Sequence, residues 1–183
     1  MALREVILTV LAHRRMTGYE IAHDFDRALS YFWRASHQQI YRELASLDKD
    51  GCVKFKVVPQ TGKPDRKVYA ITTRGRDELK KWVAEPTPPP QPRYDLLVKL
   101  MAGLLVDKAS LHREMERVSV ESRAILKQFR RMRRQCAGQP LETMAEYEQS
   151  LYLALRRGLL QVEAQTRWLG EVTEFLESGS LKR

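Results

Sequence analysis

The amino-acid sequence predicts a mainly α-helical protein with one small β-hairpin, divided in two by a proline-rich segment. In the first 85 residues the apolar positions follow helical spacing, except between about 52 and 71, where they alternate with polar residues as in a strand. After five prolines within residues 86–92, helical spacing resumes in a long heptad-like run. We therefore expect domains at 1–85 and 94–183, joined by a linker at 86–93.

The composition limits the class of protein. A chain of 183 residues with 43% hydrophobic residues can bury a core without disulfides, and its two cysteines lack metal-binding spacing. Charged residues interrupt the apolar N-terminal stretch, and there is no apolar run of about eighteen residues, so we expect a cytoplasmic protein without a membrane segment. The net charge of +9 favours an anionic partner.

Three amphipathic helices open the first domain. The first begins near the N-terminus, and the second follows a candidate N-cap at Thr17, with Glu20 three residues later as in a capping box. The third lies within residues 36–51, where Ser36 and Gln39 form a second capping-box pattern. Each of these helices has one apolar face to bury.

A basic hairpin follows the third helix. After Gly51, which occupies a C-cap position, Val and Phe residues alternate with Lys54 and Lys56. A second strand-like segment returns after a turn-rich stretch. Either Thr72 or Thr73 can cap the helix that comes next.

A helical bundle whose third helix precedes such a hairpin is the plan of the winged helix-turn-helix domain. The third helix then enters the DNA major groove while the hairpin, or wing, lies against the backbone or minor groove. Amide and imidazole groups can read base edges, and basic side chains can neutralise phosphates. The alternative is a solvated helix face beside a solvated hairpin. The candidate contacts are Ser36, His37, Gln38, Gln39, Tyr41 and Arg42 from the helix, and Lys54, Lys56, Lys63, Arg66 and Lys67 from the wing.

Within that set, His37, Gln38 and Arg42 are the favoured outward residues, since Gln39 is less available if it closes the capping box. Residues 36–81 hold eleven Lys or Arg against six Asp or Glu, a modest basic excess. Double-stranded DNA is therefore the expected partner of this segment.

Three stretches also carry a family resemblance: TGYEI before and in the second helix, FWRASHQQIYRELASLDKDGCV through the third, and GKPDRKVYAITTRGRDEL through the wing. They resemble the PadR family of bacterial transcriptional regulators, whose pattern contains GYEI, IYxxLxxLxxxG and YxLTxxG. The resemblance implies a homodimeric regulator, with repression the expected sign, on a palindromic operator. It adds Thr17, Gly18 and Tyr19 to the expected DNA contacts. Thr17 and Arg34 stand where many members have His and Pro.

The sequence of the second domain predicts a surface for self-association. A buried helix at about 95–105 precedes two long amphipathic helices, and these carry more apolar surface than two isolated helices can bury. This part resembles the C-terminal dimerisation domain of the virulence-activator subgroup of the same family. The expected dimerisation residues are Leu111, Met115, Val118, Ile125, Phe129, Met132, Leu155, Val162 and Leu169.

In that subgroup some members release DNA when a small aromatic acid binds between the domains, so the resemblance implies a small-molecule effector. The candidate lining residues are Phe32, Trp33, Tyr147, Tyr152 and Trp168, although aromatic residues at helical spacing more often belong to a core. The chain has no HExxH, P-loop, GxGxxG or GxSxG motif, so we expect neither an enzyme nor a cofactor.

Two other functions remain open. One is a ligand-independent transcriptional activator of the same fold. The other is a coiled-coil scaffold for protein interactions, which would leave the polar third helix and the lysine-bearing wing without a purpose.

Overall fold

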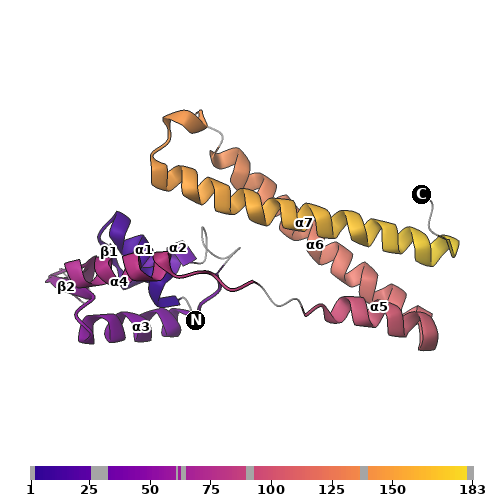
Figure 1. Ribbon diagram of the computed structural model, residues 1–183, viewed down its shortest axis with the longest axis horizontal. Coiled ribbons are helices and arrows are strands. Elements are labelled where there is room, and N and C mark those ends of the chain that lie inside the picture. The colour runs from indigo at the N-terminus through magenta and orange to yellow at the C-terminus, as the bar shows by residue number, and fades with distance from the viewer. Residues whose placement is uncertain are drawn as a thin grey trace. The chain divides into compact units, whose positions relative to one another are not determined.

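The proline-rich segment separates two structural units. The computed structural model describes residues 3–25, 33–60, 62, 65–89, 93–136 and 140–180, without the side chains of residues 135 and 136. The units, shown in Figure 1, are Met1–Pro89 and Pro90–Arg183. Each has its own apolar core.

The first unit combines helices with a small antiparallel sheet, in the strand order β1-β3-β2. The predicted helices and hairpin are confirmed. Strand β1 was not predicted, because two residues are too few to show an alternating pattern. The elements are α1 (Leu3–His13), β1 (Met16–Thr17), α2 (Gly18–Asp24), α3 (His37–Lys49), β2 (Val53–Val58), β3 (Arg66–Ile71) and α4 (Thr73–Ala84).

Both predicted capping boxes are present. At α2 the Glu20 amide donates to Thr17 Oγ1 over 3.1 Å, and the Thr17 amide donates to the Glu20 carboxylate over 2.7 Å. At α3 the Gln39 amide donates to Ser36 Oγ over 3.2 Å, and the Ser36 amide donates to Gln39 Oε1 over 2.8 Å. These bonds satisfy amides that would otherwise lack a partner in the first turn of each helix.

Helix α4 docks on the turn that ends α3. Gly51 adopts φ +71° at the end of α3, as predicted for a C-cap position, and its carbonyl accepts a 2.8 Å bond from the Thr72 hydroxyl. Thr72, rather than Thr73, caps α4, since its Oγ1 also accepts from the Gly75 amide over 3.1 Å. A Cβ on Gly75 would collide with the carbonyl of Cys52, so only glycine permits this close approach.

A charged network ties α1, α3 and α4 together. The Arg4 guanidinium contacts the Glu78 carboxylate, lies 3.0 Å from Asp50 Oδ2 and lies 3.6 Å from Glu43 Oε1. Glu78 also accepts a 2.9 Å bond from the thiol of Cys52. The hydrogen bond from Arg4 holds the pKa of Glu78 below its usual value, and burial raises the pKa of Cys52.

The second unit consists of α5 (Asp95–Val106), α6 (Lys108–Cys136), the short 3₁₀ helix η2 (Leu141–Thr143) and α7 (Glu146–Ser178). Helix α7 packs against α6, and α5 packs against the first turns of α6 (Figure 1). The core at this end is made by Leu111, Met115, Leu169 and Val172. No helix within the described ranges has both the length and the apolar character to cross a membrane.

The buried stripe of α6 departs from the predicted heptad seam. Leu126 is 8% exposed, whereas the predicted Ile125 is 40% exposed. A straight α-helix has 3.6 residues per turn, so a buried face drifts away from a strict seven-residue repeat, and the stripe here shifts by one position. The buried residues of α6 are Leu111, Met115, Ser119, Ser122, Leu126 and Phe129.

Most of the predicted dimerisation residues therefore belong to the core of a single chain. Leu111, Met115, Phe129, Leu155 and Leu169 are all buried between helices of the same unit, and the predicted seam residues Val118, Met132 and Val162 are half-buried. Their apolar surface is largely used within the chain, so other residues must supply most of any surface between copies.

Candidate nucleic-acid interface

Helix α3 has a buried apolar face and an exposed polar face, which begins in its first turn. Ile40, Leu44 and Leu47 are fully buried. The capping box fixes the start of the helix, and therefore which positions face outward. In Figure 1, α3 lies along one edge of the first unit. The predicted contact residues Ser36, His37, Gln38, Gln39, Tyr41 and Arg42 are all exposed.

Within this exposed turn, the side chain of Gln39 is partly used by the capping box, because its carbonyl accepts a hydrogen bond from the amide of Ser36. Gln38 and Arg42 are one helical turn apart and lie on the same side of α3. An amide and a guanidinium at this spacing can each make paired hydrogen bonds to base edges in a major groove.

The start of α2 packs closely against α3. Gly18 is buried, and a Cβ there would collide with the ring of Tyr41. Thr17 is only 8% exposed, and its hydroxyl donates to the Glu20 carboxylate over 2.8 Å. The hydrogen bond from the Thr17 amide, together with this one, lowers the pKa of Glu20. Gly18 and Thr17 thus have packing and capping roles, and their contact with DNA stays a prediction.

Tyr19 is the exposed member of this group. Its side chain is 67% accessible, and its ring stacks near that of His23 with a centroid distance of 6.3 Å. A phenol held in this way beside α3 can donate to a phosphate oxygen.

The wing carries its cations on exposed positions of both strands. Lys54 and Lys56 lie opposite Ala70 and Val68 in the antiparallel register, and both lysines are exposed. Arg66 and Lys67 are exposed at the start of β3, whereas Lys63 lies outside the described residues.

Packing between two aromatic rings joins the two strands of the wing. The rings of Phe55 and Tyr69 face each other across β2 and β3 with centroids 5.5 Å apart. Lys67 Nζ lies 4.4 Å from the centroid of the Phe55 ring, a cation–π contact that holds this ammonium on the hairpin. Val57 is 51% exposed near the tip, so the alternating pattern buries only the base of the hairpin.

The predicted ligand-lining aromatics do not gather at one point of the second unit, and the predicted cleft between the domains stays a prediction. Tyr147 and Trp168 are both half-buried on α7, but they are separated by 21 residues, roughly 30 Å along a helix. Trp168 packs against the core around Met115, Tyr152 is half-buried elsewhere on α7, and Trp33 belongs to the first unit. Phe32 lies outside the described residues. Separation along a rigid helix thus prevents the α7 aromatics from lining one small cavity.

A cavity of about 180 Å³ lies instead between α6 and α7. Sequence reasoning missed it, because polar residues on a long amphipathic helix are usually solvated. The predicted seam ran through Val118, and Ser119 faces α7 only because the buried stripe is shifted by one position, so spacing carried no signal for it. No group of three His, Cys, Asp or Glu in the described part of the chain could hold a metal ion.

Comparison with known families accounts for both units. The model of the transcriptional regulator PadR-like family matches residues 7–81. The model named virulence activator alpha C-term matches residues 92–177. A probable transcriptional regulator of Mycobacterium tuberculosis is 37% identical over 189 residues, which cover 97% of this chain and 98% of that protein.

Solved structures have the same architecture. The Vibrio cholerae virulence activator AphA is 32% identical, with a TM-score of 0.81 over 97% of this chain and 99% of its own. Bacillus subtilis PadR in complex with operator DNA is 24% identical, with a TM-score of 0.83 over 96% of this chain and 99% of its own. PadR has also been solved in complex with p-coumaric acid. At this identity the likeness to PadR shows the fold alone.

Proposed function

The chain belongs to the PadR-like family of transcriptional regulators, and from this premise we propose that it binds a palindromic operator as a homodimer and represses transcription. The exposed polar first turn of α3, fixed by its capping box, is the observation that carries the proposal. Its relatives are regulators, a non-enzymatic class.

In the proposed complex α3 enters the major groove. Gln38 reads adenine through its amide, and Arg42 reads guanine or contacts a phosphate. His37 and Tyr41 contact bases or the backbone at the edge of the groove. The lysines of the wing neutralise phosphates, so the affinity should fall steeply as the salt concentration rises.

An exposed apolar helix supports the homodimer. None of the twelve residues of α5 is buried, so the expectation of a buried helix is wrong for the single chain, although this helix is the most apolar of the second unit. Contiguous exposed apolar surface marks an interaction site, and a second copy would cover it. Its most exposed large side chains are Val98 at 65%, Met101 at 70%, Leu105 at 86% and Val106 at 83%.

A homodimer presents two α3 helices about one turn of DNA apart, which suits a palindromic operator. When bound in the cytoplasm across a promoter, such a dimer would exclude the polymerase, and this is the basis for proposing repression. Activation is the alternative sign. Release by a phenolic acid is proposed from the p-coumaric acid complex of the Bacillus subtilis protein.

The test is fluorescence anisotropy with promoter DNA and a scrambled duplex at two salt concentrations. The double variant Gln38→Ala, Arg42→Ala should bind the promoter at least about tenfold more weakly, since each base contact contributes about 1–3 kcal/mol. The matched control is Gln128→Ala, Arg131→Ala on exposed positions of α6. Unchanged affinity in the α3 variant would refute the assignment, and adding p-coumaric acid to the complex tests release.

A further inference from the structure

The cavity between α6 and α7 combines an apolar wall with charged ends. Met115 and Leu176 supply the apolar surface, and the other side chains around it are polar or charged. An engineered cavity of about 150 Å³ holds benzene, so this one, of about 180 Å³, has room for about six to nine non-hydrogen atoms. The lining residues are His112, Met115, Glu116, Ser119, Arg123, Thr173, Leu176 and Glu177.

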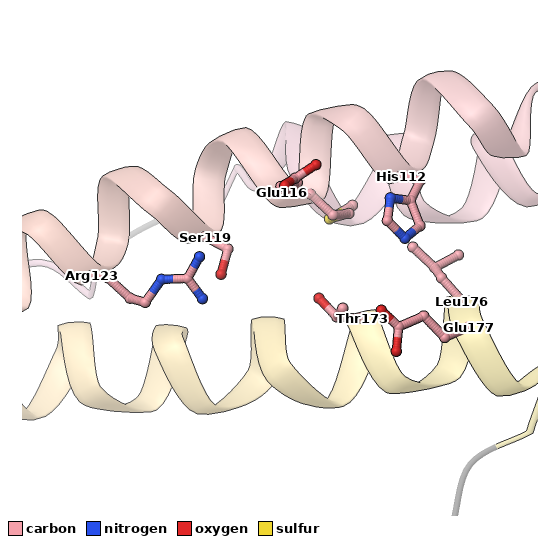
Figure 2. Close-up of a pocket in the computed structure, with 8 residues that line it drawn as sticks. His112, Glu116, Ser119, Arg123, Thr173, Leu176 and Glu177 are labelled. Carbon is pink, nitrogen blue, oxygen red and sulfur yellow. The ribbon is translucent and has the colours of Figure 1, made fainter.

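Two hydroxyl groups face the centre of the cavity. Ser119 is only 6% exposed, and its side chain makes no hydrogen bond to any described residue. In Figure 2 its hydroxyl points from α6 into the space between the helices. Thr173 lies across the gap on α7, and its hydroxyl already donates to the Leu169 carbonyl over 2.9 Å. Ser119 can therefore donate to or accept from a ligand, whereas Thr173 can only accept.

The charges are separated along the cavity. Figure 2 shows Arg123 at one end, extending beside Ser119, and Glu177 with His112 at the other. Glu116 precedes Arg123 by seven residues, about 10 Å along α6. Within the described ranges, neither Arg123 nor either of the two glutamates forms an ion pair. A cation at one end and the Glu177 carboxylate at the other are thus available to a ligand.

We propose that this cavity binds a small dipolar molecule with a carboxylate at one end, an ammonium at the other and an aliphatic stem between them. The carboxylate pairs with Arg123 and accepts from the Ser119 hydroxyl. The ammonium pairs with Glu177 and donates to the Thr173 hydroxyl. The stem packs on the apolar wall. This site goes beyond the proposed function and does not depend on DNA binding.

The test is isothermal titration calorimetry of the full chain with a series of ω-amino acids, from 4-aminobutyrate to 6-aminohexanoate. Hexanoate and hexylamine are the probes that carry one charge only. The best ω-amino acid should bind at least about tenfold more tightly than either, because each charge-assisted contact is worth about one power of ten or more.

Charge variants separate the two ends of the ligand. Arg123→Gln should weaken ω-amino acid binding about tenfold while leaving hexylamine unaffected, and Glu177→Gln should do the same while leaving hexanoate unaffected. The matched controls are Arg131→Gln on α6 and Glu171→Gln on α7, both at exposed positions outside the cavity. They should leave every affinity within about twofold.

Ser119→Ala tests the buried hydroxyl independently of charge. It should weaken binding about fivefold, yet leave the unfolding midpoint unchanged or raised, because the hydroxyl makes no hydrogen bond to any described residue. The proposal is overturned if no ω-amino acid binds at millimolar concentration. It is also overturned if hexanoate binds as tightly as the series, or if the control variants weaken binding equally.

Discussion

Ser36 determines where α3 begins, and so which of its residues face outward. Ser36→Ala removes the acceptor of the Gln39 amide, and we expect the free energy of unfolding to fall by about 1 kcal/mol. The matched control is Ser46→Ala at an exposed interior position of the same helix, where alanine should be neutral or slightly stabilising. Urea denaturation checks both, and equal losses would contradict the capping role.

Glu78 makes the first unit sensitive to acid. The hydrogen bond from Arg4 lowers its pKa from 4.5, so the carboxylate stabilises the fold above about pH 4.5, and this stability is lost as the pH falls through the lowered pKa. Urea denaturation between pH 7 and pH 3 should show a shallower loss for Glu78→Gln than for the natural chain. Glu85→Gln, at an exposed position, should keep the natural profile.

For single residues, the spacing along the sequence predicts a role only when the partner of the residue lies a few positions away. The caps Thr17 and Ser36 were identified because their partners lie three residues away. Arg4 and Gly18 were not assigned their roles in packing, because Glu78 and Tyr41 become their neighbours only when the chain folds.

Among the elements, α4 depends on one glycine for its position. Gly75→Ala would drive a Cβ into the Cys52 carbonyl, and because backbone must move, we expect a loss of about 2–3 kcal/mol in stability. Gly170→Ala on α7 is the matched control, since its Cβ would meet open space and alanine favours helix by about 0.5–1 kcal/mol. Thermal unfolding distinguishes the two, and a neutral Gly75→Ala would contradict the close approach.

Elements with a long periodic pattern could be predicted, and those defined by tertiary contacts could not. The hairpin follows from the alternation at Lys54 and Lys56, and α3 follows from its caps and apolar stripe. Strand β1 exists only because β3 pairs with it. The exposed Ile125 and the cavity beside Ser119 depend on how α6 turns toward α7, which spacing alone does not specify.

For the whole molecule, the second unit presents the surface that a partner copy would cover. Leu105→Glu places a charge on the most exposed apolar position of α5, and we expect it to shift the protein from dimer to monomer. Light scattering after size-exclusion chromatography measures the molar mass. Val83→Glu on α4, also highly exposed, is the control and should leave the mass unchanged. A dimeric Leu105→Glu variant would place the interface elsewhere.

The thiol of Cys52 can be used to measure how often the first unit opens. Its thiol is fully buried, hydrogen-bonded to Glu78 and held in its unreactive protonated form by burial. An alkylating reagent can therefore reach it only when the first unit opens, so in a chain with Cys136→Ser the labelling rate reports how often that opening occurs. A ligand that favours the closed form, operator DNA included, should slow the labelling. The labelling rate of this thiol therefore measures the fraction of the protein that is bound to the ligand.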